Sequence, residues 1–162
     1  LIRKGVNPEK IVFASIPAAS PHPSLRGAMI YVPGEQYRKK TYGFSGSAYR
    51  ARKEVREQPT VSFAKEWRQK SEGLSREFAS HVLKALRQRG ARVHPYRPVR
   101  DRVIRKHRPW VPAVLRCNQA LVQILLEACN INNPADAKLL TEPSYRQKMA
   151  DAFVDALLSY YA

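Results

Sequence analysis

The sequence has few cysteines and no long apolar run, and both shortages exclude classes of protein. Cys117 and Cys129 are its two cysteines. They form no CxxC pair and no zinc-finger spacing, so free thiols are the default and a disulfide stays possible but unsupported. No apolar run approaches the roughly 18 residues of a membrane span, and no signal peptide is visible. The chain begins at Leu1 rather than Met, so we expect an upstream part to be missing.

Negative charge is also scarce. The 162 residues include 29 Lys and Arg against 13 Asp and Glu, a net charge of +16. Residues 35–108 hold 21 of these bases and 7 of the acids, a surplus of 14. Such a field attracts nucleic acid, anionic lipid headgroups or an acidic cell-wall polymer, although a solvated basic surface without a partner is the alternative. The hydrophobic content of 44% argues against disorder and for a single domain over 1–162.

An apolar run that ends in one carboxylate is the most informative stretch. Residues 121–126 read LVQILL and lead into Glu127, followed by a polar turn. Such a run is typical of a strand buried on both faces. Glu127 would then lie at the carboxyl end of the strand, where open α/β sheets place their chemistry. A carboxylate that merely forms a salt bridge or caps a helix is the alternative. Beyond it, Asn133, Pro134 and Asp136 predict a helix N-terminus.

Other apolar stretches predict two further strands and two long helices. Residues 11–16 and 26–32 have the composition of buried strands. Apolar residues at steps of three and four predict amphipathic helices over 74–86, with Gly90 as a stop, and over 145–160. We expect irregular surface over 95–110, and residues 110–115 beside the strand that carries Glu127. Strands alternating with amphipathic helices predict an α/β domain with a largely parallel central sheet.

Residues 35–72 differ in composition and are predicted to form a basic insertion within the domain. We expect part loop and part charged helix, over about 48–57 and 62–71. Aromatic residues interleave with the bases, a pattern compatible with stacking on sugars or nucleobases. Ordinary packing within the loop also explains it, and that is the interpretation we adopt. The aromatic residues are Tyr37, Tyr42, Phe44 and Tyr49.

Three stretches together resemble a known family, the zinc-dependent N-acetylmuramoyl-L-alanine amidases. The run VLRCNQALVQILLEACNINNPADAKLLTEPSYRQKMADAFVDALLSYY resembles the C-terminal end of the family's catalytic domain. Upstream, IVFASIPAASPHPSLRGAMIYVP resembles its strand, Ser-Ile-His-Ala-Asn loop and Gly-led strand, and LSREFASHVLKAL fits the helix between. The resemblance spans about residues 3–33 and 74–161. It implies an amidase-like α/β fold whose N-terminal strands are missing from this chain.

The resemblance also implies a chemistry. The family hydrolyses the bond between N-acetylmuramic acid and L-alanine, with zinc held by a His, a Glu and a second His, and a further Glu as general base. Glu127 falls at the position of that base. The second His is expected after residues 15–16, where this chain has Pro17, and the other two ligands would precede residue 1. His22 could substitute in principle. The remaining histidines have no ligand-like spacing: His81, His94 and His107.

Three functions follow as hypotheses. The first is a peptidoglycan hydrolase with Glu127 as general base, inactive as this isolated chain. The second is a non-catalytic relative that binds cell-wall glycan or regulates an active hydrolase, and the third is a basic nucleic-acid-binding domain. The expected partners are peptidoglycan or another anionic wall polymer, and a missing N-terminal segment or a second chain that completes the domain. The resemblance implies a cell-envelope location, periplasmic or extracellular.

Overall fold

A four-stranded sheet organises the computed structural model, which describes residues 4–19, 21–44 and 46–162. The strands lie in the order β1 (Val12–Ser15), β8 (Val122–Glu127), β2 (Met29–Tyr31) and β5 (Val99–Arg100). β1 pairs with β8 and β2 with β5 in parallel, whereas β2 and β8 are antiparallel. The expected largely parallel sheet is therefore confirmed, with one antiparallel pairing at its centre.

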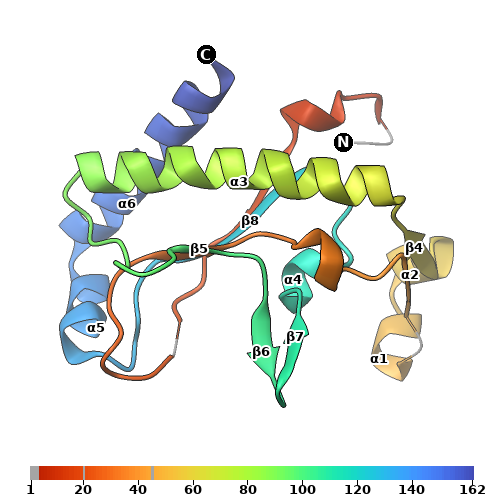
Figure 1. Ribbon diagram of the computed structural model, residues 1–162, viewed down its shortest axis with the longest axis horizontal. Helices are drawn as coiled ribbons and strands as arrows, with labels where there is room; N and C mark the ends of the chain where they lie inside the picture. The colour runs from red at the N-terminus through yellow and green to blue at the C-terminus, as the bar shows by residue number, and fades with distance from the viewer. Residues whose placement is uncertain (1–3, 20, 45) are drawn as a thin grey trace.

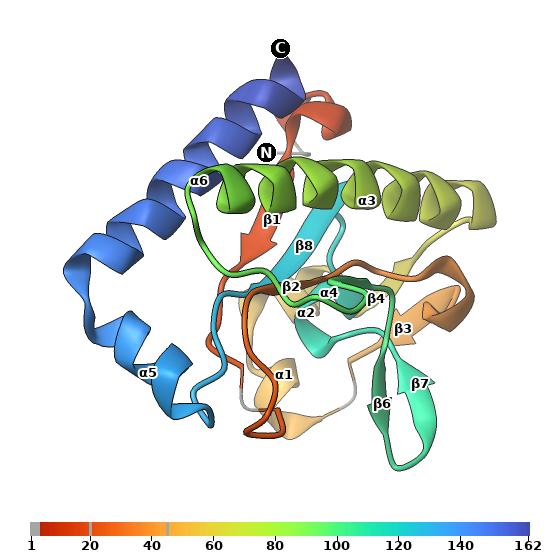
Figure 2. The same ribbon diagram turned by 60° about the vertical axis from the view of Figure 1, so that its left-hand side comes forward.

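Two long helices, α3 (Lys65–Gln88) and α6 (Pro143–Tyr161), cover one face of this sheet and cross each other (Figures 1 and 2). Alternate residues of β8 point at them, because side chains along a strand alternate between faces. Burial of each large apolar side chain contributes about 1.5–3 kcal/mol. This core includes Ile30, Phe78, Val82, Leu86, Val122, Ile124, Leu126, Ala152 and Ala156.

The helix α3 is longer than the sequence predicted. Separate helices over 62–71 and from 74 were expected, but a single helix of 24 residues runs from Lys65 to Gln88. Gly73 lies within it, exposed and without contacts at its missing Cβ position, so the glycine does not break the helix. Buried Ser71 and Ser75 on the same stretch bond to β8: Ser71 donates to the Leu121 carbonyl, and Ser75 accepts from the Gln123 amide. These bonds fix the first half of α3 to the sheet.

The opposite face of the sheet carries smaller elements. The helix α4 (Ala113–Arg116) and the hairpin of β6 (Val103–Arg105) and β7 (Arg108–Trp110) lie there, below the sheet in Figure 1. The prediction of irregular structure over 95–110 was wrong in part, because β5 (Val99–Arg100) pairs with β2 and residues 103–105 and 108–110 pair with each other as a hairpin. Residues 110–115 do pack beside β8, as expected. The cluster on this face is Phe13, Tyr31, Tyr37, Val103, Val111, Leu115 and Leu125.

The remaining elements are short. Before β1 lies the 3-10 helix η2 (Pro8–Lys10), and after β2 the 3-10 helix η3 (Glu35–Tyr37). The hairpin of β3 (Thr41–Gly43) and β4 (Thr60–Ser62) encloses α1 (Ser47–Arg50) and α2 (Lys53–Glu57). Between β8 and α6 lies α5 (Pro134–Thr141), whose predicted cap is confirmed: the Asn133 side chain accepts from the amides of Ala135 and Asp136. No helix in the described ranges is both long and apolar enough to cross a membrane.

Candidate functional site

The carboxyl ends of β1 and β8 lie side by side and define the candidate site. Their register pairs Ser15 with Leu125. The parallel ladder continues for two more residues, because the Ala128 amide donates to the Pro17 carbonyl at 3.3 Å. Pro17 therefore lies opposite Glu127. The residue that replaces the expected histidine and the residue expected to be the base are direct neighbours across two strands.

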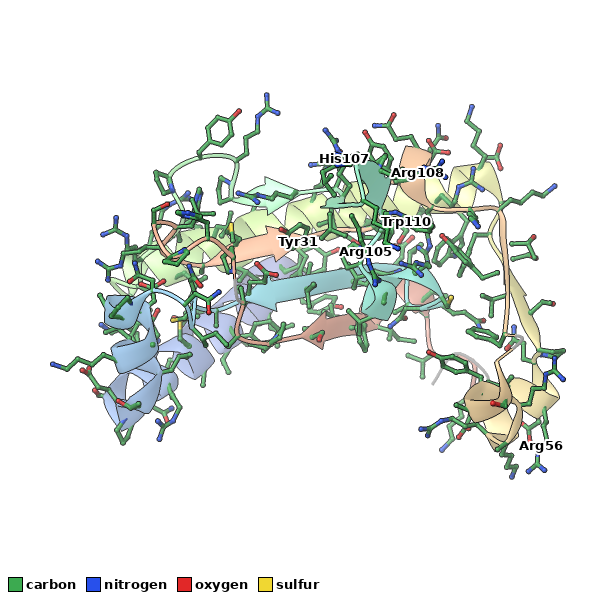
Figure 3. The ribbon with its side chains drawn as sticks, turned by 90° about the horizontal axis from the view of Figure 1, so that it is seen from below. Tyr31, Arg56, Arg105, His107, Arg108 and Trp110 are labelled. Atoms are coloured by element: carbon green, nitrogen blue, oxygen red, sulfur yellow. The ribbon has the colours of Figure 1, made fainter. Side chains whose placement is uncertain are left out.

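Glu127 shares one face of the sheet with a tyrosine and an arginine. Tyr31 pairs with Leu125, two residues from Glu127, and Arg100 pairs with Tyr31. Because paired residues point to the same side and residues two apart share a face, Glu127, Tyr31 and Arg100 all point away from α3 and α6. This is the face viewed in Figure 3, where Tyr31 is labelled. Three groups capable of proton or anion chemistry thus lie on one face of the sheet.

Burial governs the protonation of this group. Desolvation raises the pKa of the half-buried Glu127 carboxyl above its ordinary value, and the Arg100 guanidinium acts in the opposite direction. Burial also raises the pKa of the Tyr31 hydroxyl, and the Glu127 charge adds to that effect. In the described part of the chain, no hydrogen bond or salt bridge joins the Glu127 carboxylate to another side chain. A carboxyl with a raised pKa and free lone pairs is chemically suited to accept a proton.

A polar turn after Glu127 holds the loop that follows β1. The buried Asn130 donates from Nδ2 to the carbonyls of His22 and Leu25, at 3.0 and 2.8 Å. The Ala19 amide donates to Cys129, and the Ile131 amide donates back to Ala19. Residues 19, 22 and 25 of this loop are therefore held against the chain that follows β8. The sequence predicted a turn with Asn here but gave no sign that its side chain reaches residues more than 100 positions away.

Asp136 is the second anchor of this loop. Its carboxylate accepts from Arg26 Nε at 2.9 Å, from the Gly27 amide at 2.8 Å and from the Asn130 amide at 3.2 Å. The sequence placed Asp136 near a helix N-terminus, which is correct. The structure adds that it is buried and bound to a distant loop, a relationship that a helix-start signal cannot reveal.

The described residues do not fit a zinc site. No group of three His, Cys, Asp or Glu side chains in residues 4–19, 21–44 and 46–162 is arranged to hold a metal ion. Pro17 has no lone pair to give. His22 Nδ1 is engaged by Ser24 Oγ at 2.8 Å, His81 Nδ1 by Ser159 Oγ at 2.7 Å, and His94 Nδ1 by the Tyr96 carbonyl at 2.9 Å. Both cysteines are free thiols.

A buried arginine in the segment after β2 joins β4 and the start of α3 to the region of α4. The Arg38 guanidinium lies 3.9 Å from the Phe63 ring centroid and 4.9 Å from that of Trp67. It donates to the backbone carbonyls of Arg116 and Asn118 beside α4. Burial lowers the pKa of Arg38 to about 10. Nothing in the sequence singled out Arg38, because a contact between a cation and aromatic rings distant in sequence leaves no local pattern.

The insertion's aromatic residues largely pack on one another. Tyr42 lies edge-on to Phe63 with centroids 6.4 Å apart, and Phe44 lies 6.2 Å from Tyr49. Packing within the loop accounts for these contacts, as the sequence interpretation had it.

The fold is that of an α/β domain in which strand β8 ends in a carboxylate. A family model described as N-acetylmuramoyl-L-alanine amidase (Amidase_3) matches residues 8–159. The chain belongs to this amidase family. A search of the curated proteins finds no match.

Solved structures share the fold. The amidase Ami1 from Mycobacterium smegmatis is 20% identical to this chain, with a TM-score of 0.59. The match covers 92% of this chain and 53% of the Ami1 chain. The CwlD amidase from Clostridioides difficile, solved in complex with the GerS lipoprotein, is 16% identical with a TM-score of 0.54. That match covers 93% of this chain and 54% of the CwlD chain. The amidase AmiC2 of Nostoc punctiforme is 16% identical with a TM-score of 0.54, and the match covers 93% of this chain and 57% of the AmiC2 chain. This chain therefore spans just over half the length of these structures.

Proposed function

We propose that this chain provides the peptidoglycan-facing half of a muramoyl-alanine amidase site, with Glu127 as general base. The observation that carries the proposal is the position of Glu127: at the end of β8, half-buried, with a raised pKa, in a chain that belongs to the amidase family. In this role the carboxylate takes a proton from the attacking water and returns it to the leaving amine of L-alanine. The proposed location is the cell envelope.

The described residues do not provide the ligands that the family uses to hold zinc. Pro17 stands opposite Glu127 where a ligand is expected, and the described residues contain no ligand cluster. We therefore infer that any metal must be held by groups outside them, and that the isolated chain does not hydrolyse peptidoglycan. Three protein ligands are the usual minimum for a catalytic zinc site, so Glu127 cannot assemble one by itself.

An open sheet edge supports a partner that completes the domain. β1 is the outermost strand of the described sheet on its side, and its residues are only half-buried. Beside it an apolar groove of about 480 Å³ runs between the β1 end and α6, lined among others by Ile16, Met149, Phe153 and Val154. An unpaired edge next to an apolar groove favours addition of further strands. We propose that these come from the same polypeptide or from a second chain.

A non-catalytic role is the second candidate, and the same Pro17 favours it. A relative that has lost a ligand could still bind wall glycan or regulate an active hydrolase. Incubating sacculi with the natural full-length protein separates the two. The hydrolase releases stem peptides and contains near-stoichiometric zinc by elemental analysis. The binding protein sediments with sacculi, releases nothing and contains negligible zinc. If the protein neither binds sacculi nor releases stem peptides, both candidate functions are refuted.

A further inference from the structure

The β6–β7 hairpin forms one wall of a groove rich in cations. The groove has a volume of about 650 Å³, and its lining includes Arg105, Lys106, Arg108 and Arg116 together with Trp110. None of the residues that line it is acidic. Figure 3 shows Arg105, His107, Arg108 and Trp110 gathered at the hairpin, and Arg56 distant from them on the insertion. The groove thus concentrates positive charge around one indole ring.

These cations lack anionic partners within the protein. In the described part of the chain, none of the groove's four cations forms a salt bridge, whereas Arg76 and Arg102 on the other side of the hairpin share Asp101 at 3.2 and 2.8 Å. Arg116 also holds a buried Nε for which no described residue provides an acceptor, and its guanidinium lies 5.3 Å from the Trp110 centroid. Cations left unpaired in a concave site attract an external anion.

The hairpin turn places two bulky L-residues in a backbone conformation that glycine or asparagine adopts more easily. Lys106 and His107 have φ of 49° and 59°, the left-handed region. Positive φ at both central residues is the type I′ turn, for which Asn-Gly is favoured. Each L-residue with a bulky side chain costs about 1–2 kcal/mol there. A lysine and a histidine at both positions keep charge and hydrogen-bonding capacity at the tip, at the expense of stability.

We propose that this groove binds a phosphodiester-bearing polymer of the cell wall. Phosphate groups pair with the guanidinium groups of Arg105, Arg108 and Arg116, whose planar donor forks match phosphate oxygens. A sugar or polyol unit of the polymer lies against Trp110. The proposal deepens the proposed wall function and adds a second recognition surface to it. Single-stranded nucleic acid fits less well, because successive bases need a series of aromatic platforms and the groove lining has one.

The test compares two double variants of equal charge. Arg105→Gln with Arg108→Gln removes two groove cations, and Arg50→Gln with Arg56→Gln removes two exposed cations from α1 and α2. All four positions are exposed, so both variants are expected to fold. Binding is measured by sedimentation with sacculi that carry poly(ribitol phosphate), with the same sacculi stripped of phosphate polymer by hydrofluoric acid, and with single-stranded DNA, each at several salt concentrations.

We expect the groove variant to bind the phosphate-bearing sacculi about tenfold or more weakly and the control variant within about twofold of wild type. The salt dependence should become shallower by about one unit of log–log slope per groove cation removed. Equal binding to stripped sacculi, equal loss in both variants, or tighter binding to DNA each overturns the proposal. Binding to polymer without binding to stripped sacculi refutes the proposed peptidoglycan function and leaves this inference standing.

Discussion

The Asp136 carboxylate accepts a hydrogen bond from the Gly27 amide at 2.8 Å, joining the start of α5 to a loop 109 positions earlier in the chain. The same carboxylate pairs with Arg26, whose side chain is 32% exposed. This contact fixes Arg26 and Gly27 just before β2, whose Met29 pairs with Glu127. The candidate site therefore depends on one buried anion for its shape.

Replacing Asp136 should loosen that loop. Asp136→Asn keeps the size of the side chain but removes the charge that three donors share, so we expect a loss of about 2–4 kcal/mol in the free energy of unfolding. Urea denaturation followed by circular dichroism measures it. Asp151→Asn, in an exposed pair with Arg89, is the control and should change the urea midpoint little. Equal effects of the two substitutions would contradict the anchoring role.

Substituting alanine for each of two glycines should change stability in opposite directions. Gly27 has φ of 89°, and an added Cβ would lie 2.8 Å from the Val93 carbonyl carbon and 2.9 Å from the His94 amide. Gly27→Ala should therefore be strongly destabilising, because backbone must move. Gly73 is exposed within α3 with open space at that position, so Gly73→Ala should stabilise by about 0.5–1 kcal/mol. Thermal melts of both variants test this, and a destabilising Gly73→Ala would argue against a continuous α3.

Truncating Arg38 should weaken the packing of Phe63 and Trp67 against the region of α4. Arg38→Ala removes the cation beside the stacked rings of Phe63 and Trp67 and takes one hydrogen-bond donor from each of the Arg116 and Asn118 carbonyls near α4. We expect a loss of about 2–4 kcal/mol. Tryptophan fluorescence, to which Trp67 and Trp110 contribute, follows denaturation, and the exposed Arg50→Ala is the control, with a change within about 0.5 kcal/mol. A neutral Arg38→Ala would show that the insertion packs without it.

The raised pKa of Glu127 predicts a particular pH dependence of stability. The folded state binds this proton more tightly than the unfolded state, so Glu127 makes stability fall as pH rises from the ordinary value of 4.5 through the raised folded value. Glu127→Gln removes this contribution, and the stability difference between variant and wild type should grow in favour of the variant over that window. Urea titrations of both proteins from pH 4 to 8 measure it. A difference that is independent of pH contradicts burial of the carboxyl.

Periodicity and composition were enough to predict β1, β8, the final helix and the cap at Asn133, because each depends on neighbours in sequence. The same local signals failed at α3, where hydrogen bonds between two buried serines and residues 121 and 123, about 50 positions away, stabilise a stretch that lacks strong periodicity. The β6–β7 hairpin was missed because its turn uses Lys106 and His107 rather than Asn-Gly.

The candidate site divides in the same way. Glu127 was recognisable because an apolar strand ended in an acid. Pro17 was recognisable because it stands where the family resemblance expects a histidine. Their opposition across the ladder, and the roles of Asn130 and Asp136, depend on pairing over more than 100 residues. No pattern within a short window encodes such distances.

The most direct test of Glu127 as general base is the release of stem peptides from purified sacculi by the natural full-length protein. Wild type is compared with Glu127→Gln, which keeps the shape of the side chain, and with Glu54→Gln on exposed α2 as the control. We expect Glu127→Gln to lower the rate of release by about 10²–10⁴-fold, with sacculus binding retained and the control unchanged. Release by Glu127→Gln at the wild-type rate would contradict the account.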